Sequence, residues 1–481
     1  MNTNDCTVLD HFIDGAPRQP DSGQYVDGYN PATGLVISRV ARGNAADVDA
    51  AVAAARSAFG PWRDLRPMVR GRVLTEIARI VRRHAPALAS IERRESGKSA
   101  AQATGEIEVV AQYFEFYGGL AAALQGEQIN LGSQYHSYTR AEPYGVVAVI
   151  LPWNAPLNQA ARAVAPALSA GNTVVAKPSE ATSGSLLALA RTAVQECGLP
   201  PGVLNVVTGL GQEAGAPLVG HPDVKKVAFT GSLRAGREVG KIAAERVIPL
   251  TLELGGKSPD IVFADADLDA AAPGVIRAFL VNSGQVCTAG SRILVERSIH
   301  DRFVTMLAAG LTAAKPGSGD GEVAPMTTRA QYEKVQEYYA IAQAEGATAI
   351  VGGTTLQPRD HGGGWFVSPT LYIGVRNEMR IAQEEIFGPV AVVIPFDTEA
   401  EAIEIANATE YGLAAGIWTR DLARAHRVAA QLEAGQIYVN EYMAGGVETP
   451  LGGFKASGYG REKGIEALRH YSHTKCITIR F

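Results

Sequence analysis

The stretch Gly145-Val-Val-Ala-Val-Ile-Leu-Pro152 decides the fold of this chain. It is a short apolar run, rich in β-branched residues and bounded by turn residues, and a helical pattern follows it. Residues 173–177, 203–209 and 226–231 repeat this arrangement. Four apolar strands that alternate with helices predict a parallel sheet with helices on both faces.

Ligand sites in such a sheet lie at the carboxyl ends of the strands. That rule selects Trp153-Asn154, the segment Lys177 to Glu180, and Gly231-Ser232. A second α/β block begins near Gly255, with strands expected at 260–263, 292–295, 390–394 and 437–440.

The two ends of the chain have different sequence patterns. The first third is interpreted as helical, with Asn44 as an N-cap and Pro61 as the expected end of one helix. The tail, residues 475–481, alternates like a strand but has no partner nearby in the sequence.

Composition limits the class of protein. The chain has 481 residues, 46% of them hydrophobic, so two or three domains are expected. Its net charge of −5 argues against nucleic-acid binding. There is no apolar run long enough to span a membrane and no apolar signal core near Met1, so a cytoplasmic location is expected. The four cysteines form no C-x-x-C pair, which argues against a disulfide framework and a structural zinc site.

Three side chains are candidates for catalysis. Cys287 lies among small and polar residues, where a thiol is reachable and can act as a nucleophile; a buried core cysteine is the alternative. Glu253 ends an apolar strand, so burial should raise its pKa toward that of a general base, unless Lys257 pairs with it. Asn154 has an amide that can stabilise an oxyanion, or it is only a turn residue before Pro156.

Two further segments suggest a dinucleotide. An acidic residue near the end of the second strand, here Glu180, is where a dinucleotide fold holds a ribose hydroxyl. Gly231-Ser232 opens a helix whose backbone amides can meet a pyrophosphate. The usual G-x-G-x-x-G after the first strand is absent, so this pattern alone favours nucleotide binding only modestly.

Seven segments together resemble the aldehyde dehydrogenase superfamily, in family order and across nearly the whole chain. They are Pro152-Trp-Asn154, Lys177-Pro-Ser-Glu180, Phe229-Thr-Gly-Ser232, Leu252-Glu-Leu-Gly-Gly-Lys257, Gly284-Gln-Val-Cys287, Glu384-Glu-Ile-Phe-Gly-Pro389 and Pro450-Leu-Gly-Gly-Phe-Lys455. The resemblance implies two doubly wound, Rossmann-like domains and a small β element for oligomerisation. The implied boundaries are 1–124 with 144–254 for the NAD-binding domain, 255–455 for the catalytic domain, and 125–143 with 466–481 for the oligomerisation element.

The resemblance also implies roles. Cys287 would be the nucleophile, Glu253 the base that activates water, and Asn154 the oxyanion donor. Lys177 and Glu180 would hold the adenosine ribose, Ser232 the pyrophosphate and Glu385 the nicotinamide ribose, with Phe387 near the nicotinamide. The full set of expected cofactor residues is Pro152, Trp153, Lys177, Ser179, Glu180, Gly231, Ser232, Gly255, Glu385 and Phe387.

The expected activity is NAD-dependent oxidation of an aldehyde to a carboxylic acid through a thioester on Cys287. Glu180 would repel the 2′-phosphate of NADP, so NAD is the expected cofactor, and no metal is expected. A homodimer or homotetramer is expected, with neither a nucleic acid nor a membrane as partner. Two alternatives stay open: a coenzyme A-acylating semialdehyde dehydrogenase, and a catalytically silent protein on the same scaffold.

The family pattern places the aldehyde tunnel around seven residues, namely Ala155, Gln159, Arg162, Val286, Thr288, Met443 and Leu451. Ala155 is smaller than the aromatic residue that relatives often have, so a wide tunnel is expected. Arg162 falls where semialdehyde-oxidising relatives bind a distal carboxylate, and an arginine fork suits a carboxylate. The alternative is a structural arginine within a helix, and Val281 occupies the place of those relatives' second arginine.

Overall fold

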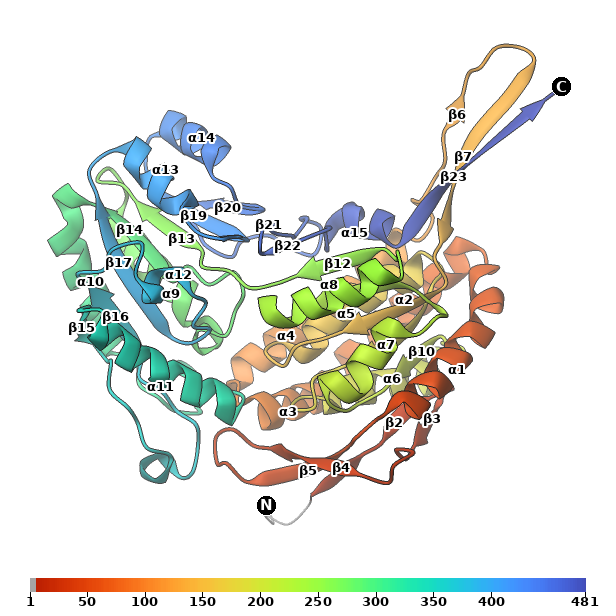
Figure 1. The fold of residues 1–481 in the computed structure, drawn as a ribbon, viewed down its shortest axis with the longest axis horizontal. Helices are drawn as coiled ribbons and strands as arrows, with labels where there is room; N and C mark the ends of the chain where they lie inside the picture. Colours follow the sequence, from red (N-terminus) through yellow and green to blue (C-terminus); the bar gives the residue numbers. More distant parts are fainter. Residues whose placement is uncertain (1–5) are drawn as a thin grey trace.

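The computed structural model describes residues 6–481 and consists of two α/β bodies with a projecting arm (Figure 1). The first body is built on an eight-stranded sheet. In spatial order its strands are β22 (Gly458–Tyr459), β12 (Leu250–Glu253), β11 (Val224–Thr230), β8 (Val146–Ile150), β9 (Thr173–Lys177), β10 (Leu204–Val206), β2 (His11–Ile13) and β3 (Ala16–Arg18). The five strands from β12 to β10 are parallel: β8, β9, β10 and β11 are the four that the sequence predicted, and β12 extends them. The pairs at both edges of the sheet are antiparallel.

Helices cover both faces of this sheet, because its strands are apolar on both sides. Helices α1, α7 and α8 share a core with one face, and helices α2 to α6 share a core with the other. Their bounds are α1 (Ala45–Arg63), α2 (Pro67–Arg83), α3 (Ala85–Ser96), α4 (Ala100–Gly119), α5 (Pro156–Ser169), α6 (Gly184–Glu196), α7 (Ala216–Gly220) and α8 (Leu233–Glu245).

Two expectations for the first third of the chain are wrong. Pro61 does not end its helix: α1 continues to Arg63, and Asp64 still donates a backbone hydrogen bond to the Gly60 carbonyl. Pro61 lies so close to the end that its missing N–H removes little of the helical ladder. Residues 7–41 are not helical either. They form β2, β3 and a three-stranded sheet of β1 (Thr7–Leu9), β5 (Val36–Ala41) and β4 (Tyr25–Tyr29).

The second body is built on a seven-stranded sheet that is parallel except at β15. Its strands, in spatial order, are β15 (Thr348–Val351), β16 (Thr370–Ile373), β17 (Val390–Phe396), β14 (Arg292–Glu296), β13 (Pro259–Val262), β19 (Ala414–Trp418) and β20 (Gln436–Val439). The covering helices are α9 (Leu268–Leu280), α10 (His300–Thr312), α11 (Arg329–Ala344), α12 (Arg380–Gln383), α13 (Glu399–Asn407) and α14 (Leu422–Gln431).

The chain leaves the first body after Glu253 and returns to it through its C-terminal part. A short ribbon of β18 (Tyr411–Gly412) and β21 (Phe454–Lys455) precedes β22, which pairs with β12, and α15 (Gly464–His470) packs against α5. The side chains at the ends of β8, β11 and β12 therefore face residues of the second body.

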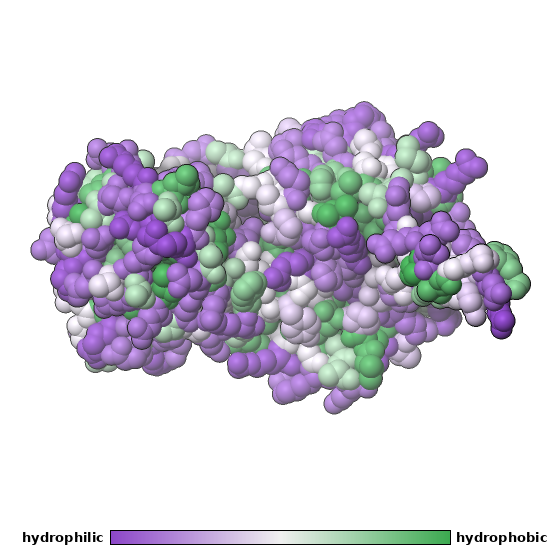
Figure 2. All heavy atoms as spheres, turned by 90° about the horizontal axis from the view of Figure 1, so that it is seen from above, coloured by the Kyte–Doolittle hydropathy of each residue, from purple (hydrophilic) through white to green (hydrophobic). Residues whose placement is uncertain are grey.

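The arm contains the C-terminal strand. β23 (Ser472–Arg480) pairs with β7 (Tyr135–Pro143) over nine residue positions, and β7 also pairs with β6 (Gln128–Ile129). Figure 2, seen from above, shows apolar side chains on this arm at the right edge of the molecule. No helix of the described residues is both long and apolar enough to cross a membrane.

Candidate active site

Cys287 lies where two cavities meet. The first, called here the Trp153 cavity, has a volume of about 160 Å³ and is lined by Trp153, Ser232, Glu253 and Phe387, among others. The second, called the Tyr438 cavity, has a volume of about 290 Å³ and opens on the other side. Asn154, Gln159 and Cys287 line both. The thiol can therefore be approached from two directions, as a group between a cofactor and a substrate must be.

A strained turn holds the cysteine. Asn282, Ser283 and Gly284 all have positive φ angles, of 51°, 55° and 72°. A side chain at Gly284 would come within 2.0 Å of the Gly388 carbonyl oxygen, so only glycine fits there. Strain of this kind persists where surrounding contacts enforce it.

Polar side chains supply those contacts. The Asn282 amide donates to the carbonyl oxygens of Asn154 and Gln285, at 3.0 and 3.2 Å. The Ser283 hydroxyl donates to the Ala324 carbonyl at 2.7 Å, and the Thr327 backbone N–H donates to the Gln285 side chain at 2.9 Å. The turn is thus tied to both bodies, which fixes where the thiol points.

Glu253 ends β12 and faces the Trp153 cavity. Its side chain is buried, and its Oε1 has no hydrogen-bond partner within the described part of the chain. Burial raises the pKa of Glu253 to about 8, with a further contribution from Glu462, while Arg162 and Arg461 lower it. A carboxyl group with such a pKa and a free oxygen can accept a proton near neutrality.

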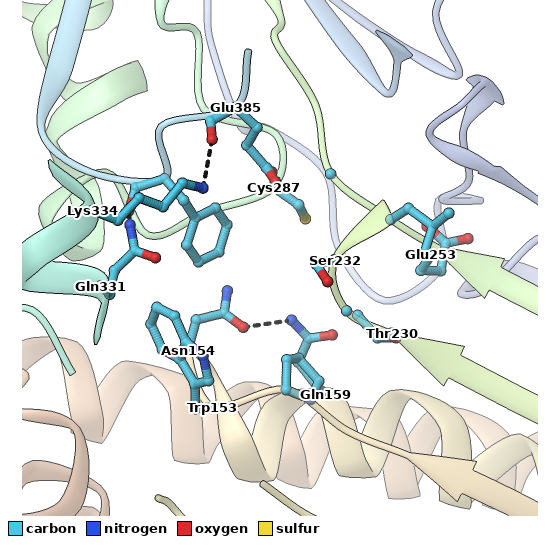
Figure 3. Close-up of a pocket in the computed structure, with 15 residues that line it drawn as sticks. Trp153, Asn154, Gln159, Thr230, Ser232, Glu253, Cys287, Gln331, Lys334 and Glu385 are labelled. Carbon is cyan, nitrogen blue, oxygen red and sulfur yellow. Dashed lines mark hydrogen bonds between the residues drawn. The ribbon is translucent and has the colours of Figure 1, made fainter. Parts of the chain in front are cut away.

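Asn154 follows β8, is buried, and lies across the cavity from the Cys287 thiol (Figure 3). Its side-chain nitrogen donates to the Gln285 carbonyl at 2.9 Å, and its side-chain oxygen accepts a bond from Gln159 at 3.3 Å. An amide nitrogen carries two hydrogens. The second is available to a group that enters between Asn154 and Cys287.

In another wall of the Trp153 cavity, the backbone at Gly255 and Gly256 lies close to the Glu385 side chain. Glu385 accepts a hydrogen bond from the Gly256 backbone N–H at 3.1 Å, and a side chain at Gly255 would come within 2.4 Å of its carboxylate. Phe387 meets Trp153 edge to face, with ring centroids 5.4 Å apart. Thr230, Gly231 and Ser232 bring the N-terminus of α8 to the same cavity, where helix dipoles favour an anion.

The side chains around Cys287 disfavour ionisation of its thiol. Burial raises its pKa to about 11, and the Glu253 and Glu385 carboxylates raise it further, whereas Arg162 lowers it. An additional positive charge near the sulfur would be needed to populate the thiolate near neutral pH.

Residues 18–477 match the sequence model of the aldehyde dehydrogenase family. The chain belongs to the aldehyde dehydrogenase family. It is 41% identical to DhaS of Bacillus subtilis (strain 168), a protein assigned to the aldehyde dehydrogenases, over 97% of this chain and 95% of the relative.

Two solved structures are similar over nearly their full length. The P. syringae AldA indole-3-acetaldehyde dehydrogenase, a mutant in complex with NAD+ and IAA, has a TM-score of 0.96 at 41% identity, covering 98% of this chain and 96% of that one. The NAD+ complex of an aldehyde dehydrogenase from Bacillus cereus has a TM-score of 0.95 at 40% identity, with the same coverage. The predicted family and fold class are therefore confirmed.

The structure of this aldehyde dehydrogenase gathers most of the predicted site residues. Seven of the expected cofactor residues line the Trp153 cavity, namely Pro152, Trp153, Gly231, Ser232, Gly255, Glu385 and Phe387. All seven expected substrate residues line the Tyr438 cavity. Lys177, Ser179 and Glu180 lie apart from both; the Lys177 ammonium donates to the carbonyl oxygens of Pro178 and Gly209, each at 2.7 Å.

Arg162 lines the Tyr438 cavity, but its charge already has a partner. Its guanidinium forms an ion pair with the buried carboxylate of Glu462 and donates to Gln159 at 2.7 Å and Thr230 at 3.3 Å. These contacts favour a structural role for Arg162 within its helix over binding of a substrate carboxylate. Lys257 forms no ion pair with Glu253; besides burial, the charges of Arg292 and Glu385 have the largest effects on its pKa.

Sequence reasoning missed several lining residues. Gln331 and Lys334, on α11, approach the Trp153 cavity and donate to the backbone carbonyls of residues 385–387 at 2.7–2.9 Å. Tyr438 and Lys463 line the other cavity. These four residues belong to no local sequence motif. They can be identified as site residues only once the fold shows that their helices, strands and loops face the site.

Proposed function

We propose that this chain oxidises an aldehyde to a carboxylic acid with NAD, through a thioester on Cys287. The observation that carries the proposal is the position of Cys287 in the walls of two cavities, one of which Asn154 and Glu253 also line. An enzyme of this kind must hold a substrate carbon between a nucleophile and a hydride acceptor.

The residues of the Trp153 cavity fit the nicotinamide end of NAD. Glu385 has the carboxylate for ribose hydroxyls, and Gly255 leaves room beside it that a side chain would fill. The α8 N-terminus suits a pyrophosphate, and Lys177 and Glu180 suit the adenosine ribose. When bound, the nicotinamide supplies a hydride acceptor and a positive charge next to the thiol.

The first chemical step belongs to Cys287. The thiolate adds to the aldehyde carbon, and the carbonyl oxygen becomes an oxyanion. The free N–H of the Asn154 amide and the Cys287 backbone N–H would donate to that oxyanion, which assists departure of the hydride and leaves a thioester.

The second step belongs to Glu253. Its carboxylate would take a proton from a water molecule as the water attacks the thioester, which releases the carboxylic acid and the free thiol. The pKa of about 8 and the free Oε1 support this role, because the group is a stronger base than an exposed glutamate. An intact Glu253 favours hydrolysis over transfer to coenzyme A.

Further parts of the proposal concern cofactor choice and assembly. Glu180 would repel the 2′-phosphate of NADP, so we expect NAD to be preferred. We also propose a cytoplasmic homodimer or homotetramer, joined through residues 125–143 and 466–481. The domain boundaries expected above belong to the same proposal. No group of acidic, histidine or cysteine side chains in the described residues is arranged to hold a metal ion.

The deciding experiment is NADH formation with a panel of aliphatic, aromatic, cationic and carboxylated aldehydes, without coenzyme A. We expect turnover of at least one aldehyde and none in Cys287→Ser. Turnover only with coenzyme A would favour the acylating alternative. No turnover, together with a thiol that no aldehyde protects from alkylation, would favour a silent scaffold.

A further inference from the structure

Three charged side chains line the Tyr438 cavity, and two of them are already paired. Glu106 accepts bonds from the Lys98 ammonium at 2.5 Å and the Gln102 amide at 3.0 Å. Arg162 pairs with Glu462. The third is Lys463, which forms no ion pair with any described residue; its ammonium only approaches the Thr449 hydroxyl, at 3.4 Å.

Lys463 also has an unusual backbone. Its φ of 60° and ψ of 169° lie in a region that is adopted almost only by glycine, at a cost of about 1–3 kcal/mol for other residues. Both flanks are fixed: Glu462 exchanges two backbone hydrogen bonds with Leu451, and the Gly464 N–H donates to the Val447 carbonyl at 2.8 Å. This strained backbone places a cationic side chain, and not a glycine, at the cavity wall.

The surroundings of Lys463 leave its charge poorly compensated. Burial lowers its pKa to about 8, repulsion from Arg162 lowers it further, and Glu448 opposes both effects. Glu448 does not line the cavity. An anion inside the Tyr438 cavity would therefore gain the attraction of a partly desolvated ammonium that has no competing partner.

We propose that Lys463 is a specificity-determining residue that binds an anionic group, a carboxylate or a phosphate, at the end of the substrate distant from the aldehyde. The proposal rests on the function proposed above, because it places that anion in the cavity that leads to Cys287. The sequence suggested an aldehyde with a distal carboxylate, bound by Arg162. We retain that class of substrate and assign the binding of its anionic group to Lys463 instead.

The rest of the cavity suits a polar substrate of modest size. Asn158, Gln436 and Tyr438 contribute amide and hydroxyl groups to its wall, and its volume is about 290 Å³. The Tyr438 hydroxyl donates to the Gln436 side-chain oxygen at 2.9 Å, and the Gln436 side-chain nitrogen approaches the Pro450 carbonyl at 3.4 Å. The Asn158 amide and the second N–H of the Gln436 amide can therefore donate to the oxygens of an anionic tail that Lys463 holds.

The test compares a four-carbon aldehyde that has a terminal carboxylate with its neutral methyl ester. We expect the unmodified enzyme to have a kcat/KM for the carboxylated aldehyde at least about tenfold higher, a difference of roughly 1.4 kcal/mol. Lys463→Gln should remove most of this preference through KM, and Lys463→Arg should keep most of it. Lys225→Gln, on the exposed side of β11, is the matched control and should behave as the unmodified enzyme.

A phosphorylated three-carbon aldehyde and its dephosphorylated form, in the same assay, show which anion is preferred. The proposal is overturned if the unmodified enzyme does not prefer either anionic substrate, or if Lys463→Gln leaves that preference intact.

A binding assay separates this inference from the proposed function. A four-carbon dicarboxylate should slow alkylation of the Cys287 thiol in the unmodified chain and much less in Lys463→Gln. Oxidation of no aldehyde would refute the proposed function, whereas equal protection in both proteins would refute the anion site.

The preference should also depend on pH. The ammonium is lost as pH rises through about 8, so the ratio of KM for the carboxylated aldehyde to KM for the ester should rise there. Titration of Cys287 and Glu253 affects both substrates and cancels in the ratio. The neighbouring Arg162 and Glu462 form an ion pair, and Glu448 only shifts the midpoint. A ratio that is flat between pH 6.5 and 9.5 would contradict the assignment.

Discussion

At the scale of single residues, the burial of Glu253 carries a structural cost that the proposed role as a base would explain. A carboxyl group that is buried with one unpartnered oxygen is unfavourable when ionised, and its pKa of about 8 reflects this. At pH 7 the group is therefore mostly protonated. Because folding raises its pKa from 4.5 to about 8, the folded chain keeps a proton that the unfolded chain releases, and the free energy of unfolding falls as pH rises from about 4.5 to about 8.

This predicts the behaviour of Glu253→Gln. Glutamine has the shape of the neutral acid, so folding at pH 7 should be little affected, but it cannot deprotonate water. We expect a burst of about one NADH per active site, followed by steady turnover about 10²–10⁴-fold slower than in the unmodified enzyme. Rapid-mixing absorbance measures both phases.

The steady rate of the unmodified enzyme should rise with pH through about 8, where the carboxylate forms, and that rise should be absent in the variant. A variant that loses the burst as strongly as the steady rate would place Glu253 before the hydride transfer and not after it.

At the scale of elements, the turn of residues 282–284 determines where Cys287, the proposed nucleophile, lies. Gly284→Ala would put a Cβ within 2.0 Å of the Gly388 carbonyl oxygen, at a φ of 72° that disfavours a side chain. The turn must move, and Cys287 with it. We expect kcat/KM to fall about 100-fold or more, since small displacements of reacting groups have effects of this size.

The matched control is Gly346→Ala, at the end of α11. Gly346 also has a positive φ, of 82°, but a side chain there would meet nothing within 4 Å. It should lose about 1 kcal/mol of stability and keep its activity. Thermal unfolding and kcat/KM for both variants separate backbone strain from displacement of the thiol; equal activity in both would contradict the positional role of the turn.

The parallel strands could be predicted from the sequence because each is a short apolar run between turn residues. The N-terminal strands were missed because β1 and β3 are short and largely exposed, and the buried β2 has only three residues, so hydrophobic periodicity does not mark them. One signal was nevertheless present. Asp14-Gly15 has positive φ at both residues and joins β2 to β3, and Asp-Gly is typical of a tight hairpin.

At the scale of the whole molecule, the site is assembled from parts that are distant in sequence. The ion pair between Arg162 and Glu462 joins residues 300 positions apart, on two segments that meet only after the chain has returned to the first body. The family motifs selected Cys287, Glu253 and Asn154, which the structure places around one cavity. They could not show that Arg162 has an internal partner and Lys463 has none, because that depends on packing between α5 and the segment before α15.

The projecting arm is the part of the molecule that a second copy should cover. Its three strands and the residues next to them expose five large apolar side chains, namely Ile129, Leu131, Tyr135, Ile479 and Phe481, of which Phe481 is 81% exposed. A small exposed sheet with such residues is unfavourable in water and is typical of an interface.

We expect the double variant Leu131→Lys and Ile479→Lys to shift the protein to monomers in sedimentation velocity, because lysine is costly to bury without a partner. Leu422→Lys, a substitution at a residue that is 73% exposed on α14, should leave the assembly unchanged. A monomeric unmodified protein, or an arm variant that sediments as the control does, would show that this apolar surface is not the interface.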